Sequence, residues 1–177
     1  MEKLKFIQIQ KDNEHHFYET AKLWMAYIQE LDSHEGMKIT LKENEIVNNL
    51  RKRIEIQGQR PDMHFEIAYH QDEPVGIANF AIDLGTIYGL IESGYGTVME
   101  FYIKPEFRRK GFGKIFLNHI ESVLRNDGAR NMYICPDLVT GKPFWKTMGF
   151  VDTGKIDPDS KLPIYTKDIA FTQGGYR

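Results

Sequence analysis

The sequence has little of several features that define common classes of protein. Its single cysteine, Cys135, excludes an internal disulfide and a cysteine-based zinc cluster, and is typical of a reducing compartment. No stretch approaches the ~18 apolar residues of a membrane span, and the N-terminus lacks the apolar segment of a secretory signal. The net charge of −2 gives no general attraction to nucleic acid. These absences predict a cytoplasmic protein that binds neither membrane nor nucleic acid.

The composition is that of an ordinary folded domain. The 177 residues are 41% hydrophobic and 12% aromatic, which excludes disorder as the main state. A chain of this length buries enough surface to hold a core without disulfides or metals. We therefore expect one domain that spans residues 1–177.

Helical and strand-like patterns alternate along the whole chain. Apolar residues at steps of three and four predict helices, and alternating or continuous short apolar runs predict strands. The expected helices are 15–31, a second one from Thr40 through Ile46 toward Ile54, 113–126 and 140–148. The expected strands are 5–10, 64–69, 75–82, 98–103, 132–135 and 164–169, with a further extended piece from Phe150. This order indicates a mixed α and β fold.

A basic glycine turn between the strand 98–103 and the helix 113–126 is the strongest local signal. It reads Arg108-Arg109-Lys110-Gly111-Phe112-Gly113-Lys114. Two glycines that open a helix let a ligand approach the backbone, and the first N–H groups of a helix attract anions. Residues 104–114 carry five basic residues and one acid, a net charge of +4, so the rest of the chain sums to −6. The turn predicts a phosphate site, whereas the alternative is a simple turn with solvated charges.

Other phosphate motifs fit this turn poorly. The sequence contains no Gly-x-x-x-x-Gly-Lys-Ser/Thr pattern, and the dinucleotide pattern Gly-x-Gly-x-x-Gly fails because its third position is Phe116. These absences argue against a nucleotide-dependent enzyme, a rival function that tight ATP or NAD binding without CoA binding would revive.

Residues 98–150 resemble the acyl-CoA-binding core of the GNAT superfamily of N-acetyltransferases. Arg108, Gly111 and Gly113 match the family pattern Arg/Gln-x-x-Gly-x-Gly/Ala, and Phe144 with Gly149-Phe150 matches a later aromatic and Gly-Phe motif. The resemblance implies an α+β fold with a mixed, largely antiparallel central sheet flanked by helices on both faces. It implies direct transfer of an acetyl group from acetyl-CoA to a primary amine, without a metal. A homodimer is common in proteins of this kind.

The resemblance also implies a set of cofactor-binding residues. The backbone of 101–103 would bind the pantetheine arm and acyl group, and one N–H there would polarise the thioester carbonyl. The amides of 109–114 would hold the pyrophosphate, and nearby Arg or Lys side chains would meet the 3′-phosphate. The full set is Phe101, Tyr102, Ile103, Arg108, Arg109, Lys110, Gly111, Phe112, Gly113 and Lys114. The acetyl-CoA would lie where two central strands diverge, between Ile103 and Cys135.

Glu100 is the candidate catalytic base, because it is the one charge in the run 98–103. A carboxylate buried beside the acyl site has a raised pKa and can accept a proton from an ammonium. The alternative is a structural Glu paired with a nearby Arg or Lys. Glu66 and Glu92 are weaker candidates for the same role.

The later motif departs from the family pattern, because Leu138, Gly141 and Trp145 stand where the family often has Asn, Ala and Tyr. Trp145 stands where the family usually has a tyrosine that protonates the leaving thiolate, and an indole N–H is no useful acid. Water, Tyr102 or Tyr133 are the alternatives. The missing tyrosine motivates a rival function, a catalytically inactive acyl-CoA-binding module of the same fold.

The remaining polar residues give weaker signals. The six histidines form no metal-ligand pattern, and Cys135 is interpreted as a small buried hydrophobe. The segment Arg51-Lys52-Arg53 is interpreted most simply as a solvated helix face, with a position near the substrate or a partner as the alternative. The acceptor amine stays open among a polyamine, an amino acid, an aminoglycoside and a protein N-terminus, and acids in the loops are hypothesised to attract it. Those acids are Asp83, Glu92 and Asp137.

Overall fold

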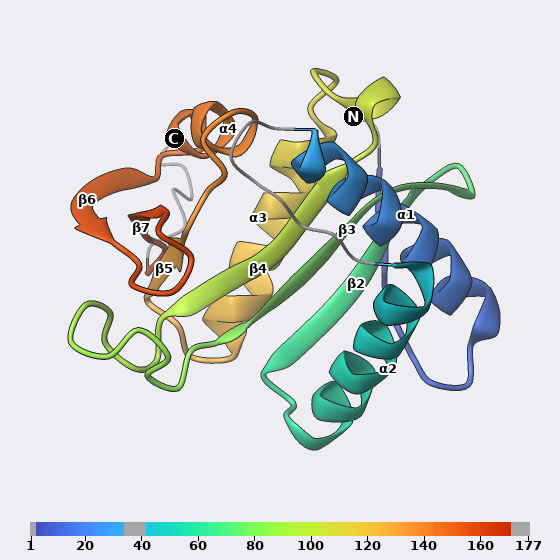
Figure 1. Ribbon diagram of the computed structural model, residues 1–177, viewed down its shortest axis with the longest axis horizontal. Coiled ribbons are helices and arrows are strands. Elements are labelled where there is room, and N and C mark those ends of the chain that lie inside the picture. The colour runs from blue at the N-terminus through green and yellow to red at the C-terminus, as the bar shows by residue number, and fades with distance from the viewer. Residues whose placement is uncertain (1–2, 34–41, 171–177) are drawn as a thin grey trace, which may run out of the picture. The chain divides into compact units, whose positions relative to one another are not determined.

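The computed structural model describes residues 3–33 and 42–170, and its elements follow the predicted order (Figure 1). The helices are α1 (Glu14–Asp32), α2 (Glu43–Gln59), a short 3-10 helix η1 (Pro105–Phe107), α3 (Phe112–Asn126) and α4 (Gly141–Thr147). The strands are β1 (Lys5–Gln8), β2 (Met63–His70), β3 (Glu73–Ile82), β4 (Gly96–Ile103), β5 (Asn131–Ile134), β6 (Val151–Ile156) and β7 (Pro163–Asp168). The cap expected at Thr40 lies outside the described residues.

Local sequence explains where the first two helices begin and end. The side chain of Asn13 caps α1 by accepting the His16 N–H at 3.2 Å. The carboxylate of Glu45 accepts the Lys42 N–H at 2.7 Å at the start of α2. The helix continues one residue past Gly58 and ends just before Pro61, because the residue before a proline disfavours helical geometry.

The seven strands form one sheet in the order β1-β2-β3-β4-β5-β7-β6. The pairs β1–β2, β5–β7 and β6–β7 are antiparallel, whereas β4–β5 is parallel. The sheet is therefore mixed and mostly antiparallel, as predicted. The parallel pair has only two partners in register, Gly96 with Met132 and Thr97 with Tyr133.

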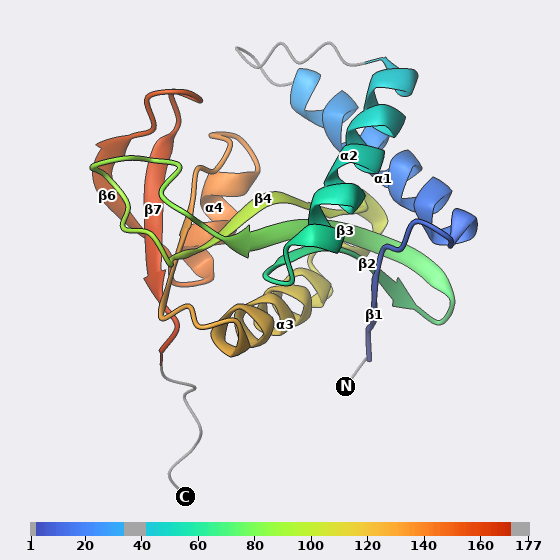
Figure 2. The same cartoon turned by 90° about the horizontal axis from the view of Figure 1, so that it is seen from below.

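The chain divides into two compact units, and the first comprises Met1–Phe80 and Met99–Leu117. Its main core lies between the helices α1 and α2 and one face of the strands. Both helices and the strands β2, β3 and β4 contribute side chains to it. These side chains include Trp24, Leu50, Phe65, Ile67, Ile77 and Tyr102. On the opposite face, Phe116 of α3 stacks on Phe6 of β1 at 5.0 Å between ring centres. Helices therefore cover both faces of these strands (Figure 2), as predicted.

The second unit comprises Ala81–Val98 and Asn118–Arg177. A small core joins the loop before β4 to β5 and β7 through Ile87, Ile91, Tyr133 and Ile164. In the same unit, Trp145 of α4 packs edge-on against Phe150, with ring centres 5.1 Å apart. Among the described residues, no helix is long and apolar enough to cross a membrane.

Candidate active site

The turn between β4 and α3 has the special backbone conformation expected at one of its two glycines, Gly111, and also at an arginine, whereas Gly113 lies inside α3. Arg109 and Gly111 adopt φ angles of +62° and +87°. The first helical hydrogen bond of α3 runs from the Ile115 N–H to the Gly111 carbonyl at 3.1 Å. The N–H groups of residues 112–114 therefore precede the helical ladder and have no carbonyl one turn back to bind. A Cβ placed on Gly111 would meet no atom within 4 Å, so the space beside this backbone is open.

The turn presents three positive charges outside any ion pair of the described residues, one of which, Lys110, lies 5.6 Å from the centre of the Phe107 ring. Arg109, Lys110 and Lys114 are exposed and form no ion pair with any residue in 3–33 or 42–170. Lys104, by contrast, pairs with Glu73 at 2.8 Å and with Glu106 at 3.0 Å. The charge available to an anion thus lies on the same side chains that flank the open backbone of Gly111.

Arg108 plays a different part from its neighbours. Its Nε donates to the Ile103 carbonyl at 2.8 Å, and its Nη2 donates to Glu30 of α1 at 2.6 Å. The guanidinium carbon also lies 5.5 Å from the centre of the Tyr102 ring. Arg108 therefore ties the basic turn to the end of β4 and to α1, and its charge is already committed.

The end of β4 leaves part of its backbone without a strand partner. The register with β5 stops at Thr97, so residues 98–103 have no β5 partner in the described chain. Met99 is 40% exposed and Phe101 is half-buried, so this strand is less enclosed than its apolar sequence predicts. On the other side, β3 approaches closely because Gly76 lacks a Cβ, which would otherwise contact the Tyr102 carbonyl.

Glu100 lies on the face of β4 that α1 and α2 cover, where Tyr102 also points. Its Oε1 accepts from Arg53 Nη2 of α2 at 2.7 Å, and its side chain is 12% exposed. The second oxygen, Oε2, is buried without a hydrogen-bond partner. Burial raises the pKa of Glu100, while the Arg53 guanidinium and the Asn79 amide oppose that rise. The carboxyl is thus both paired with an arginine and shifted toward neutrality, which combines the two interpretations that the sequence left open.

Arg53 is the partner of the candidate base, a role that the sequence analysis did not assign to it. The segment 51–53 was expected to form a solvated face, and Arg51 and Lys52 are indeed exposed. Arg53 is half-buried, and its guanidinium carbon lies 5.1 Å from the centre of the Trp24 ring. Its position three residues after Leu50 on the buried stripe of α2 was the available signal.

The other candidate acids have different roles. Glu66 is buried on the face of β2 opposite Phe65, away from the α1 and α2 side. Glu92 is exposed in the loop before β4. The carboxylate of Asp83 accepts from the Thr86 N–H at 3.1 Å, and that of Asp137 accepts from the Gly141 N–H at 2.7 Å. The carboxylates of Asp83 and Asp137 are therefore already hydrogen-bonded to backbone N–H groups nearby in the chain.

The candidate proton donors are weak acids here. Trp145 is 6% exposed inside the second unit, in keeping with a packing role. Burial raises the pKa of Tyr133 to about 12 and also raises that of Tyr102. Burial likewise raises the pKa of Cys135 to about 11, so its thiol stays protonated at neutral pH.

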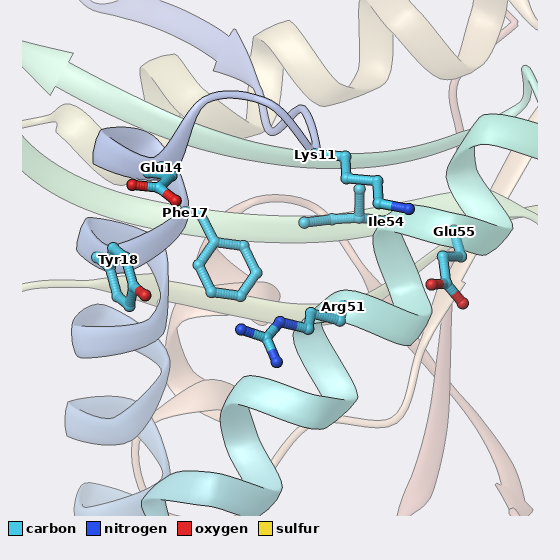
Figure 3. Close-up of a pocket in the computed structure, with 7 residues that line it drawn as sticks. All are labelled: Lys11, Glu14, Phe17, Tyr18, Arg51, Ile54 and Glu55. Atoms are coloured by element: carbon cyan, nitrogen blue, oxygen red, sulfur yellow. The ribbon is translucent and has the colours of Figure 1, made fainter.

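A separate hollow lies between α1 and α2 (Figure 3). It encloses about 170 Å³ over a floor that includes Phe17 and Ile54, and charges of both signs surround it. Arg51 extends over the Phe17 ring at 5.7 Å. None of its lining side chains holds a buried polar atom that lacks a partner. None of the predicted site residues lines it, so we assign it no chemistry.

Comparisons with known proteins identify the family of this chain. The sequence profile of the acetyltransferase (GNAT) family matches residues 17–150, so the chain belongs to this family. A sequence search of curated proteins gave no match. Within residues 3–33 and 42–170, no group of three or more His, Cys, Asp or Glu side chains is placed to hold a metal ion.

Three similar solved structures show the same fold at low sequence identity. An acetyltransferase from Thermus thermophilus has a TM-score of 0.67 and 19% identity, covering 95% of this chain and 99% of its own. PaiA N-acetyltransferase from Thermoplasma acidophilum, in complex with coenzyme A, has a TM-score of 0.66 and 18% identity, with coverages of 94% and 99%. A GNAT family acetyltransferase from Brucella melitensis, in complex with acetyl-CoA, has a TM-score of 0.60 and 16% identity, with coverages of 95% and 89%.

Proposed function

We propose that this chain is an N-acetyltransferase that moves the acetyl group of acetyl-CoA directly to a primary amine. The observation that carries the proposal is the open, basic turn at Gly111 in a member of the GNAT family. Three solved structures with the same fold are acetyltransferases, and two of them hold coenzyme A or acetyl-CoA.

The residues of the turn fit the phosphates of acetyl-CoA. The N–H groups of residues 112–114 and the open space at Gly111 suit a pyrophosphate at a helix N-terminus. Arg109, Lys110 and Lys114 are free to meet the 3′-phosphate, whereas Arg108 is committed to Ile103 and Glu30. We therefore assign Arg108 to holding the turn and assign the charge recognition to its three neighbours.

The unpaired backbone at the end of β4 suits the other half of the ligand. Residues 101–103 would bind the pantetheine arm through N–H and carbonyl groups that β5 does not use. One of these N–H groups would donate to the acyl carbonyl oxygen, where negative charge develops during attack.

Glu100 would make the amine nucleophilic. An acceptor arrives as an ammonium at neutral pH, and Glu100 Oε2, which has no partner, would take one proton from it. Acetyl-CoA supplies the acetyl group as a thioester, whose C–S bond breaks as the nitrogen–carbon bond forms. The amine loses a second proton as the thiol forms, so one ammonium and one thioester give an amide, a thiol and one released proton.

The replacement of tyrosine by Trp145 favours the second candidate, an acyl-CoA-binding module without turnover. Neither Tyr102 nor Tyr133 is a better acid than a free tyrosine, since burial raises the pKa of both. If the chain is an enzyme, water is therefore the simplest donor to the thiolate. Acetyl-CoA binding without thiol release across an amine panel would identify the module.

A thiol-release assay with acetyl-CoA and an amine panel tests the proposed function. We expect Glu100→Gln to lower kcat/KM by about 10²- to 10⁴-fold, the range for loss of a general base. Glu55→Gln, which changes an exposed acid of α2, should leave kcat/KM unchanged. Equal rates for wild type and Glu100→Gln would overturn the assignment of the base. The cytoplasmic location and the homodimer stay predictions.

A further inference from the structure

Four polar side chains of the first unit meet beneath α1 and α2, and we call them the Arg53–Glu100 cluster. Trp24 comes from α1, Arg53 from α2, Asn79 from β3 and Glu100 from β4. The Arg53 guanidinium lies over the Trp24 ring and pairs with Glu100 Oε1. The amide of Asn79 is close enough to Glu100 to stabilise its ionised form. The four side chains therefore form one connected polar cluster on the face of the sheet that α1 and α2 cover.

Most of these groups have unused hydrogen-bonding capacity. Within the described residues, the Trp24 Nε1, both amide atoms of Asn79 and Glu100 Oε2 are buried and make no hydrogen bond of normal geometry, although the Asn79 amide is near enough to Glu100 to stabilise its charge. Trp24 is 3% exposed and Asn79 is fully buried. Buried polar groups in native proteins are nearly always paired, because an unpaired one is costly. Two donors and two acceptors in one cluster therefore indicate a polar ligand with groups of both kinds.

The charge of the cluster restricts that ligand further. Arg53 and Glu100 sum to zero, and they are the charged members of the cluster. A ligand with only an ammonium would add positive charge beside the Arg53 guanidinium, and a polyamine would add more. A zwitterion keeps the cluster neutral, and a guanidinium binds a carboxylate through two parallel hydrogen bonds.

We propose that the acceptor amine belongs to an amino acid, whose ammonium binds Glu100 Oε2 and whose carboxylate binds Arg53. Asn79 completes the site by bonding the ammonium or the carboxylate through its amide. The Arg53 side chain is 28% exposed, so a carboxylate can reach its guanidinium from solvent, whereas Glu100 Oε2 is buried and must be uncovered before an ammonium can bind it. This proposal rests on the proposed function, since the same Glu100 oxygen accepts the proton of the acceptor.

The test compares each of the twenty common amino acids with its C-terminal amide, which differs only in lacking the carboxylate. Spermidine and an aminoglycoside complete the panel, and thiol release gives kcat and KM. Calorimetric titration of the same compounds into the protein saturated with coenzyme A gives binding without turnover. Variants are Arg53→Met, Arg53→Lys and, as a matched control on the same helix, Lys52→Met.

We expect at least one amino acid to exceed its amide at least tenfold in kcat/KM, and to exceed spermidine and the aminoglycoside. Arg53→Met should remove this preference by raising KM for the amino acid more than for its amide, Arg53→Lys should restore part of it, and Lys52→Met should change nothing. A preference for amides or polyamines, or no calorimetric binding of any amino acid, would overturn the proposal. Amino-acid binding that depends on Arg53 without thiol release would uphold the ligand class and refute the proposed function instead.

Discussion

At the scale of single residues, the two oxygens of Glu100 have different environments, which allows one carboxyl group both to pair with an arginine and to serve as the proposed base. Arg53 occupies Oε1 at 2.7 Å, which explains how a charge is tolerated on a strand beneath two helices. Oε2 has no partner, so the same carboxyl retains a site for a proton. Burial outweighs the arginine and raises the pKa, which moves the group toward the range of a useful base.

The pH dependence of turnover follows from this environment. Because the pKa of Glu100 is raised, kcat/KM should climb with pH through a value above the usual Glu pKa. Arg53→Met removes the guanidinium that opposes burial, so the climb should move to higher pH. Profiles of kcat/KM against pH for the two proteins measure this shift, and a shift to lower pH would contradict it.

The same raised pKa makes a prediction about stability. The folded protein holds the Glu100 proton more tightly than the unfolded chain does, so ionisation favours unfolding. The free energy of unfolding of wild type relative to Glu100→Gln should therefore fall as pH rises from the unfolded pKa through the folded one. Urea titrations of both proteins across this range test the sign. A relative stability that rises with pH would show that Arg53 outweighs burial.

Gly111 and Gly154 form a matched pair for the anion site. Both have positive φ angles, +87° and +72°, and a Cβ at either would meet no atom within 4 Å. Alanine at either position should cost about 1–2 kcal/mol of stability, since the left-handed conformation disfavours a Cβ. Only Gly111→Ala should also weaken acetyl-CoA binding, by about tenfold or roughly 1.4 kcal/mol, in calorimetric titration. Equal affinities of the two variants would place the ligand elsewhere.

Sequence analysis reached part of the candidate site at this scale. Glu100 and the glycines stand out because each breaks a local pattern, a charge in an apolar run or two glycines at a helix start. Asn79 and Glu30 gave no such signal, and Arg53 gave only its place on the buried stripe of α2, because their partners lie on elements far apart in the chain. The commitment of Arg108 to Glu30 was hidden for the same reason, since a basic motif looks alike whether its charges are free or paired.

At the scale of elements, Arg108 fastens the basic turn to two neighbours. Arg108→Ala removes the bonds to the Ile103 carbonyl and to Glu30, and should cost about 1–2 kcal/mol because the pair is partly exposed. Arg109→Ala removes an exposed, unpaired charge and should cost less than about 0.5 kcal/mol. Chemical denaturation measures the free energy of unfolding of both variants. Equal losses of stability would contradict the role of Arg108 in fastening the turn.

Gln57 fixes α2 against the sheet, one turn after Arg53. Its Nε2 donates to the Ile9 carbonyl at 2.8 Å, and its Oε1 accepts from the Phe65 N–H at 2.6 Å. Gln57→Leu would leave both buried backbone groups unpaired, at a cost of about 2–4 kcal/mol. Gln59→Leu, exposed on the same helix, is the control. Thermal unfolding compares them, and a similar Tm for both variants would contradict this role.

The elements were easier to predict than their arrangement. Helical spacing in α1 and the apolar runs of β2, β3 and β4 are local signals, so each element appears within a few residues of its predicted bounds. The place of β7 between β5 and β6 depends on pairing between distant segments. The early end of the β4–β5 pairing also depends on contacts between distant segments. Neither feature can be predicted from a local sequence pattern.

At the scale of the whole molecule, charge is distributed unevenly. The chain carries −2 overall, yet residues 104–114 carry +4. Lys104 and Arg108 are neutralised by acids of β3 and α1, which leaves the free positive charge on the turn itself. An anionic ligand is therefore attracted to one place on an otherwise acidic protein.

The central claim is that this turn binds acetyl-CoA. Calorimetric titration of the wild-type protein with acetyl-CoA, ATP and NAD tests it most directly, with Gly111→Trp as a blocked variant and Gly154→Trp as a control for folding. We predict binding that is selective for acetyl-CoA, lost in Gly111→Trp and retained in Gly154→Trp. Binding of ATP or NAD in place of acetyl-CoA, or acetyl-CoA binding that survives Gly111→Trp, would contradict the account.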